Sequence, residues 1–411
     1  MAKDYKDLVV GLDIGTAKVL VVVAEVMPGG ELKLAGLGGG PSNGIKRGVV
    51  VNIDATVQSI QEAIREAEKM IGASIARARI YTGITGSHIR GINSSGMVAI
   101  RDREVTRADK ARVLETAKAI NISADQHLLL AEAQEFVIDG QEVKEPIGMS
   151  GIRLEAKVHI VTGTNSAAEN VMKCVRRCGL QVDHLMLHPL ASSLSVLTQD
   201  EKELGVALVD IGAGTTDVAI FTNGAIRHTA VIPIAGDLIT SDIAMALRTP
   251  TKAAEDIKIE SGHAKQALID PHVQVTVPGL GDRAPRELSK QALSGVIEPR
   301  VEEIFSLVHQ IIRESGFEEV LSSGIVLTGG SSVMPGLVEL GEDIFLKPVR
   351  RGVPRYSGPL ADMVAYPHAA TAMGLLEKAW QDRIGDHFVD RRAGTVKTAF
   401  GRFRDFIVGN F

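Results

Sequence analysis

Three short glycine-containing turns follow apolar stretches of the chain and are the segments best suited to chemistry. They read GLDIGTAK at 11–18, VDIGAGTTD at 209–217 and LTGGSS at 327–332. Because glycine has no Cβ, the backbone N–H groups of such turns can close on phosphate oxygens. Threonine hydroxyls in the first two turns add donors, and Lys18 can neutralise charge. One such turn alone is typical of a plain β-hairpin, but the set of three indicates a nucleotide.

Two aspartates, Asp13 and Asp210, stand at matching places in the first two turns. A carboxylate repels phosphate, so direct contact between either side chain and a nucleotide is unfavourable. Their positions make sense if Mg²⁺, usually with its waters, lies between the carboxylates and the phosphates. We therefore predict that Asp13 and Asp210 are metal-binding residues.

Length and composition restrict the function classes. A chain of 411 residues is expected to hold about two to four domains. Charged residues make up 23% and the formal net charge is −5, so no global basic field points to nucleic acid. The first fifteen residues contain no apolar run long enough for a signal peptide or a membrane span. We expect a cytoplasmic protein without a nucleic-acid partner.

The first two turns belong to a pattern that occurs twice. Residues 8–26 predict two apolar strands around a turn that Gly11 and Gly15 permit, and residues 204–224 have the same shape. Two copies of one pattern predict two related halves. The third turn, within 324–337, lies between a buried strand and a new helix.

Hydrophobic periodicity predicts the elements between the turns. Residues 54–72 form an amphipathic helix with Asp54 or Thr56 as cap and Gly72 as its end. Residues 104–120 form a helix that starts with a Thr106…Asp109 capping box. Further expected elements are a half-buried strand at 152–163, a helix at 249–262, a strand, loop and return strand at 272–289, and a long helix at 293–316.

In order and separation, the three turns resemble the two phosphate loops and the adenosine loop of the actin, DnaK and sugar-kinase superfamily. Together with GVALVDIGAGTTDVAIFTNGAIRHTAVIPIAGDLITSDIA at 205–244 and a phenylalanine-rich tail, they resemble more closely the FtsA family of bacterial cell-division proteins. The resemblance covers essentially the whole chain. It implies an α/β, actin-like (ribonuclease-H-like) fold of two lobes, with an inserted α+β subdomain and a C-terminal amphipathic helix.

The resemblance also implies how the chain is divided. The first lobe would comprise 1–84 and 164–205, with a return helix at 365–380, and the inserted division-specific subdomain would be 85–163. The second lobe would comprise 206–245 and 313–364, with 246–312 as its upper subdomain. A linker at 381–395 and an amphipathic helix at 396–411 would follow.

ATP binding in the cleft between the lobes is a further implication of the resemblance. Gly15, Thr16 and Ala17, followed by Lys18, correspond to the first phosphate loop. The second phosphate loop corresponds to Gly212, Ala213, Gly214 and Thr215, followed by Thr216. The adenosine loop corresponds to Gly329, Gly330, Ser331 and Ser332. Glu255 and Lys258 match a helix that lies against the nucleoside. The alternative for this last pair is a solvated helix face.

One segment departs from the pattern of active ATPases. These enzymes often carry an acid before the second phosphate loop, where it orients the attacking water. His188-Pro189 stand at that place here. The sequence supplies no partner to orient the histidine, and such a residue is more often structural. We expect firm ATP binding, weak or absent hydrolysis and no catalytic residue.

The resemblance implies a scaffold that polymerises with itself and anchors the FtsZ ring to the cytoplasmic face of the cell membrane at the division site. The FtsZ C-terminal peptide would bind the upper subdomain, with Arg286, Lys290 and Arg300 as exposed basic candidates. Later division proteins would contact the inserted subdomain at 85–163. Alternatives are a small-molecule kinase, for which a catalytic acid is missing, an ATP-regulated chaperone, for which a C-terminal peptide-binding domain is missing, and a pilus-assembly adaptor.

The last residues favour the scaffold over the adaptor. AFGRFRDFIVGNF at 399–411 contains four of the ten phenylalanines. A helix over 396–411 would gather them on one arc, and it is too short to span a bilayer but suits an anionic membrane surface. A terminal core helix is the commoner alternative, but the core should be complete before the polar linker. The predicted membrane-binding residues are Phe400, Arg402, Phe403, Arg404, Phe406, Ile407 and Phe411.

Overall fold

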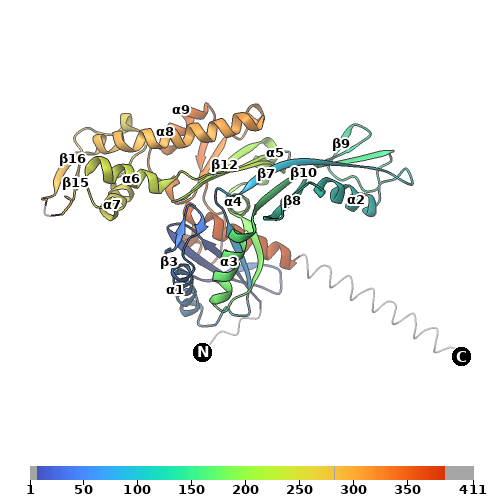
Figure 1. Ribbon diagram of the computed structural model, residues 1–411, viewed down its shortest axis with the longest axis horizontal. Coiled ribbons are helices and arrows are strands. Elements are labelled where there is room, and N and C mark those ends of the chain that lie inside the picture. Colours follow the sequence, from blue (N-terminus) through green and yellow to red (C-terminus); the bar gives the residue numbers. More distant parts are fainter. Residues whose placement is uncertain (1–6, 282, 385–411) are drawn as a thin grey trace.

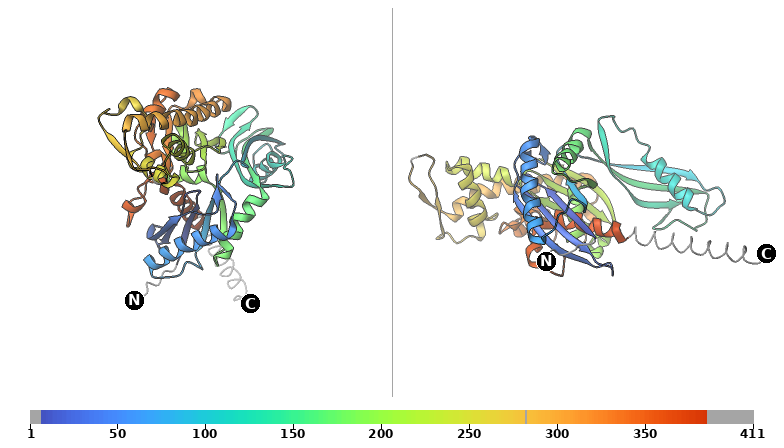
Figure 2. Two further views of the ribbon diagram at one scale, coloured as in Figure 1. Left: turned by 60° about the vertical axis from the view of Figure 1, so that its left-hand side comes forward. Right: turned by 90° about the horizontal axis from the view of Figure 1, so that it is seen from below.

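The computed structural model describes residues 7–281 and 283–384. The predicted amphipathic helix at 396–411, its seven membrane-binding residues and most of the predicted linker lie outside the described residues. Two lobes stand one above the other, and two smaller parts extend to opposite sides of them (Figures 1 and 2). None of the described helices is both long and apolar enough to cross a membrane.

The first lobe is built on a five-stranded sheet with the strand order β11-β6-β1-β2-β3. Its strands are β1 (Leu8–Ile14), β2 (Lys18–Val26), β3 (Leu32–Pro41), β6 (Arg79–Ile84) and β11 (Val182–Leu187), and a small ribbon of β4 (Ile45–Lys46) and β5 (Val49–Val50) lies beside it. Strand β1 pairs antiparallel with β2 and parallel with β6. The predicted hairpin at 8–26 is confirmed.

Helices cover both faces of this sheet because alternate residues of its strands are apolar on both sides. Helices α1 (Ile53–Ile71) and α3 (Asn165–Arg177) pack on one face, and a helix over 370–384 packs on the other. Gly11 belongs to β1, where a Cβ would collide with the Ala372 carbonyl of this last helix. The prediction that Gly11 permits the turn is therefore wrong, because its function is close helix packing.

Helix α1 begins one residue earlier than predicted, and its cap is a different residue. The Asn52 side chain accepts a hydrogen bond from the Ala55 N–H at 3.1 Å, so neither Asp54 nor Thr56 is the cap. Gly72 ends the helix in the left-handed conformation, with φ 72°, as the sequence predicts.

The second lobe repeats the first, as predicted from the two copies of the turn pattern. Its sheet has the order β14-β13-β12-β17-β18, and β12 pairs antiparallel with β13 and parallel with β17. The strands are β12 (Val206–Ile211), β13 (Thr216–Thr222), β14 (Ala225–Ile232), β17 (Ile325–Thr328) and β18 (Val349–Arg351). The covering helices are α4 (His188–Val196), α5 (Gln199–Leu204), α6 (Gly236–Leu247), α8 (Lys290–Ser315) and α9 (Leu337–Phe345). The short helix α10 (Ala361–Val364) instead packs Val364 into the core of the first lobe.

The upper part of the second lobe extends to the left in Figure 1. It contains α7 (Thr251–Ser261), the antiparallel pair β15 (Gln274–Val277) and β16 (Arg286–Ser289), and the first half of α8. The predicted strand, loop and return strand are thus confirmed. Helix α8 starts earlier than the predicted 293, because the Ser289 hydroxyl caps it by accepting from the Ala292 N–H at 3.2 Å.

An inserted four-stranded antiparallel sheet, in the order β7-β10-β8-β9, extends to the right in Figure 1. It comprises β7 (Arg90–Ala99), β8 (Gln126–Ile138), β9 (Gln141–Val143) and β10 (Arg153–Thr164), and α2 (Arg107–Lys118) packs on one face. The predicted Thr106…Asp109 capping box is present. The predicted α+β insertion is therefore confirmed as a fold element.

Buried polar contacts dock this insertion on the second lobe. Nδ1–H of His159, on β10, donates to Asn93 Oδ1 at 2.6 Å, and the Thr229 hydroxyl of β14 donates to His159 Nε2 at 2.9 Å. Arg227, also on β14, donates through Nη1 to Glu135 at 2.9 Å, and both side chains are largely buried. The insertion is therefore covalently part of one lobe and held by side chains to the other.

Two further predicted helices also have different bounds. After Gly329 the chain forms one 3-10 turn at Gly330–Val333, and α9 begins only at Leu337. The predicted helix at 365–380 begins at 370 and continues to at least 384, so the first four residues of the predicted linker are helical. Two hydrogen bonds anchor the extension. The Tyr81 hydroxyl donates to the Asp382 carboxylate at 2.9 Å, and Arg383 Nε–H donates to the Asp7 carboxylate at 2.7 Å.

Candidate functional site

The three glycine turns converge on one cavity of about 300 Å³ between the lobes. The first two turns close alike: Gly15 N–H donates to the Lys18 carbonyl and Gly212 N–H to the Thr215 carbonyl, each at 2.9 Å. Turns separated by almost two hundred residues therefore have one geometry and face one space. The predicted residues that line it are Asp13, Gly15, Thr16, Ala17, Lys18, Asp210, Gly212, Ala213, Gly214, Thr215, Glu255, Lys258, Gly329, Gly330 and Ser331.

The two lobes touch at these turns because glycine leaves room. A Cβ on Gly214 would lie 2.6 Å from the Thr16 hydroxyl oxygen, so only glycine permits the observed approach. The Ser331 hydroxyl donates to the Gly212 carbonyl at 2.8 Å and joins the third turn to the second. A ligand in the cavity would consequently contact both lobes at once.

Two predicted cofactor-binding residues do not face the cavity. Thr216 opens β13, and its hydroxyl donates to the Ile234 carbonyl at 2.8 Å. The buried Ser332 hydroxyl donates to the Gly329 carbonyl at 2.8 Å within its own turn. Their hydroxyls stabilise the loops, and neither residue lines the cavity, so their contact with the cofactor stays a prediction.

The two predicted metal ligands are buried at the floor of the cavity. Asp210 accepts hydrogen bonds from the Ser192 hydroxyl at 2.6 Å and the Thr371 hydroxyl at 3.4 Å, and burial raises its pKa. Asp13 Oδ1 finds no hydrogen-bond partner among the described residues. Lys18 donates to the His368 carbonyl, and burial lowers its pKa although both carboxylates oppose that shift.

This donor set fits Mg²⁺ accompanied by phosphates. Mg²⁺ keeps several waters and is usually held by one or two carboxylates plus substrate phosphates. Asp13 supplies an oxygen without a partner, and Asp210 supplies a second buried carboxylate beside it. Within residues 7–281 and 283–384, no group of three or more His, Cys, Asp or Glu side chains has the arrangement of an all-protein metal site.

Five polar residues of the cavity were not predicted as site residues, namely Thr85, His188, Asp217, His368 and Thr371. Burial raises the pKa of Asp217 to about 6, and its carboxylate accepts hydrogen bonds from Thr85 and, at 2.9 Å, from Thr215. His188 begins α4 with Nε2 3.8 Å from Asp13 Oδ1, beyond hydrogen-bond distance. A charged residue within the apolar run TDVAIF was a usable signal for Asp217; no sequence signal linked Thr85 to this site.

Glu255 and Lys258 form the outer wall of the cavity on α7. Lys258 Nζ donates to Glu255 at 2.7 Å, to Thr240 at 2.8 Å and to the Gly236 carbonyl at 3.2 Å, with its side chain only 10% exposed. The alternative of a solvated helix face is therefore wrong for Lys258. Exposed Ile259 and Val333 add apolar surface at the mouth, where a flat base could pack.

Comparison with known proteins decides the family. The family model described as "Cell division protein FtsA" matches residues 207–374, and "SHS2 domain inserted in FTSA" matches residues 86–162. The Cell division protein FtsA of Pseudomonas aeruginosa is 59% identical over 370 residues, which cover 90% of this chain and 88% of that protein. The Escherichia coli K12 protein is 44% identical over 400 residues, covering 95% of this chain and 94% of the relative.

The chain belongs to the FtsA family of cell division proteins. Solved structures that resemble this FtsA-family chain include the "PilM-PilN type IV pilus biogenesis complex", with TM-score 0.63 and 18% identity over 90% of this chain and 98% of that one. "MreB 5 of Spiroplasma citri bound to AMPPNP" has TM-score 0.58 and 15% identity over 94% of this chain and 99% of that one. These likenesses show the actin-like fold and confirm that prediction.

The three basic residues predicted to meet FtsZ lie at the upper part of this FtsA-family chain, but they are not equally available. Arg286 is exposed, although its Nη2 donates to the Leu247 carbonyl at 2.6 Å. Lys290 is half-buried at the start of α8. Arg300 is also half-buried and makes two hydrogen bonds to Asp242, at 2.6 and 3.1 Å. The prediction that all three are exposed is wrong, while their role toward FtsZ stays a prediction.

Proposed function

We propose that this chain is an ATP-binding, actin-like scaffold that assembles with copies of itself and attaches the FtsZ ring to the inner face of the cell membrane. The observation that carries the ATP part is the convergence of three glycine turns and α7 on one cavity that both lobes line. Backbone N–H groups of the first two turns would hold the phosphates, and Asp13 and Asp210 would hold Mg²⁺ through its waters. The Gly329 turn, Glu255 and Lys258 would contact the nucleoside.

The arrangement supports binding more strongly than hydrolysis. His188 is buried and stands where active relatives often carry an acid, but Asp13, its acidic neighbour in the cavity, lies too far away for a hydrogen bond. Bound Mg²⁺ would supply charge neutralisation between the carboxylates and the phosphates. The chain's own contribution is to join both lobes around one ligand, and that closure is the state in which we expect copies to assemble.

Membrane attachment follows from the predicted tail helix. Each cation near an anionic surface contributes about 1 kcal/mol, while Gly401 and Gly409 each oppose helix formation by about 1 kcal/mol. One tail is therefore expected to bind reversibly, and a filament presenting many tails firmly, through effective concentration. Family membership supports this role.

The upper subdomain and the insertion provide the partner surfaces in this proposal. The FtsZ C-terminal peptide would bind at 246–312, where Arg286 is the most accessible of the three basic candidates. Later division proteins would contact the insertion at 85–163. A pilus adaptor or a small-molecule kinase remains the alternative class, and the fold alone does not separate these functions.

The test is vesicle pelleting with purified FtsZ, with and without Mg²⁺ and ATP. We expect ATP to increase co-sedimentation of the full chain with anionic vesicles and to bring FtsZ into the pellet. Phe403→Glu should remove lipid binding and leave nucleotide binding intact. Undiminished pelleting of that variant would refute the membrane role, and phosphoryl transfer to glycerol or a sugar would favour the kinase.

A further inference from the structure

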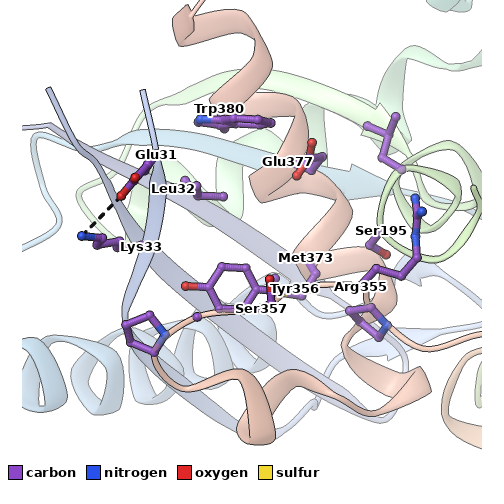
Figure 3. A pocket seen from close by; sticks show the side chains of 14 residues that line it. Glu31, Leu32, Lys33, Ser195, Arg355, Tyr356, Ser357, Met373, Glu377 and Trp380 are labelled. Carbon is purple, nitrogen blue, oxygen red and sulfur yellow. Dashed lines mark ion pairs between the residues drawn. The ribbon is translucent and has the colours of Figure 1, made fainter. Parts of the chain in front are cut away.

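A second cavity, of about 520 Å³, lies on the first lobe and shares no lining residue with the nucleotide cavity. Figure 3 shows its walls: Met373, Glu377 and Trp380 on the helix over 370–384, Tyr356 on the preceding loop, and Leu32 on β3. Strand β3 is an edge strand of its sheet. We call this surface the Trp380 groove.

The groove is held in shape by hydrogen bonds between its walls. Trp380 Nε1 donates to the Gly30 carbonyl at 2.7 Å, and the Leu34 N–H of β3 donates to the Tyr356 hydroxyl at 3.0 Å. The Arg355 N–H donates to the Ser195 carbonyl at 3.0 Å. The lining combines aromatic and aliphatic side chains with the charged groups of Glu31, Lys33, Arg355 and Glu377. Concave sites that join apolar surface to a few polar groups are the usual form of a binding site.

The chain itself places an apolar segment beside this groove. Trp380 lies one helical turn, or about 6 Å, before Ile384, and a Cβ on Gly30 would lie 3.8 Å from Ile384 Cδ1. Residues 385–411 therefore leave the described part of the chain at the rim of the groove. Fifteen residues, from 385 to 399, give a reach of roughly 20 Å, enough for the phenylalanines that follow to contact the groove.

We propose that Phe400, Phe403 and Ile407 occupy the Trp380 groove when the protein is free in solution and leave it when the tail enters a membrane. Their spacing of three and four residues is that of anchors on an apolar helix face. A short tether gives such a segment a millimolar effective concentration, so even a modest affinity fills the groove. The membrane half of this statement rests on the proposed function.

The consequence is competition for the same side chains. Because Phe400, Phe403 and Ile407 cannot lie in the groove and in lipid at once, groove binding would keep the tail out of water and out of unrelated apolar contacts. An anionic vesicle would bind the tail more strongly than the groove does, because the vesicle buries the apolar side chains and also neutralises Arg402 and Arg404. The groove would then be empty in the membrane-bound protein.

Trp380 makes this testable because it is the one tryptophan in the sequence. Acrylamide quenching of its fluorescence is measured on the full chain and on two full-length variants, without and with vesicles of phosphatidylglycerol and phosphatidylcholine. Phe403→Glu places a charge on the apolar arc, while Thr398→Glu adds the same charge outside it as the matched control. Neither residue lies in the described fold, so both variants should fold.

We expect the quenching constant of the unaltered chain and of Thr398→Glu to be at least about twofold lower than that of Phe403→Glu, independent of protein concentration. Adding vesicles should raise the quenching constant of the unaltered chain to that of Phe403→Glu. Equal quenching of all three proteins without vesicles would overturn the proposal, and so would protection that disappears on dilution, which would mean a second copy's tail. Vesicle pelleting of the same samples reports separately on the membrane role.

Discussion

Gly83 leaves the space that the imidazole ring of His188 fills: a Cβ on Gly83 would collide with Nε2 and Cδ2 of the ring. Gly83 belongs to β6 of the first lobe, and His188 opens the helix that leads toward the second. Asp13 also lies near the ring, with its Oδ1 3.8 Å from Nε2. The position of His188 in the cavity therefore depends on the absence of a side chain at Gly83, 105 positions earlier in the chain.

Gly83→Ala should destabilise the fold and displace His188. Overpacking of a buried site costs about 1–3 kcal/mol, and urea denaturation measures the loss. The double variant Gly83→Ala/His188→Ala removes the ring that the methyl group meets, so it should recover most of that loss. If the effects of the two substitutions simply added, the predicted contact between the two positions would be refuted.

Lys258→Ala should weaken ATP binding. Lys258 donates to Glu255, Thr240 and the Gly236 carbonyl at the outer wall of the cavity. A hydrogen bond from a charged group contributes about 1.5–3 kcal/mol, so we expect at least about a tenfold rise in the dissociation constant by calorimetry. Lys252→Ala, on the exposed side of the same helix, is the control and should bind ATP normally. Equal affinities of the two variants would argue against nucleoside contact by α7.

Two neighbouring glycines of the third turn should respond differently to alanine. Gly329 has φ 86° and ψ 167°, a region that essentially only glycine adopts, and its Cβ would collide with Asp210 Oδ1. Gly329→Ala should therefore lose about 1–3 kcal/mol of stability and also bind Mg²⁺-ATP poorly.

A Cβ on the next residue, Gly330, would come no closer than 3.9 Å to its neighbours. Gly330→Ala should therefore keep the melting temperature of the unaltered protein and lose ATP affinity alone, because the methyl group would take space from the ligand. Normal ATP binding by Gly330→Ala would show that the ligand does not approach this backbone.

Acid should loosen the docked insertion through His159. Burial lowers the pKa of His159 to about 4, from an ordinary value near 6.5. Because the folded protein holds this histidine neutral, its contribution is present above pH 6.5 and is lost as pH falls toward 4. Between pH 7 and 5 the unaltered protein should lose about 2 kcal/mol of unfolding free energy from this group.

Urea denaturation at the two pH values measures that loss against variants. His159→Gln should lack this part of the pH dependence, whereas His127→Gln, an exposed histidine of the same insertion, should retain it. An unchanged pH dependence in His159→Gln would mean that other groups cause the acid sensitivity.

The parts of this fold that were predictable are those with local causes. Glycine turns between apolar strands, the Thr106…Asp109 capping box and the repeat of one hairpin in two halves are all visible within a few residues of sequence. The order of the three turns, which resembles that of the family, then predicted that they meet in one cleft. Side-chain direction was not visible in the same way.

Thr216 and Ser332 show why the direction of a side chain could not be predicted from the sequence. Each is adjacent to a residue that does line the cavity, Thr215 and Ser331, but successive positions of a strand or turn point to different sides. The contact of Thr85 with Asp217 joins residues 132 positions apart, and no local pattern predicts such a pair. The Trp380 groove is likewise made by segments that only the fold brings together.

The docking of the insertion on β14 has a mechanical consequence for the lobes. Chain connections attach the insertion to the first lobe, while Arg227–Glu135 and Thr229–His159 fix it to the second. Separating the lobes at that edge would break a largely buried ion pair, and leaving one of its charges unpaired costs about 3–5 kcal/mol. Rotation of the lobes is therefore cheaper about an axis near the insertion, which would widen the opposite edge, where α7 and the third glycine turn face the first lobe across the cavity.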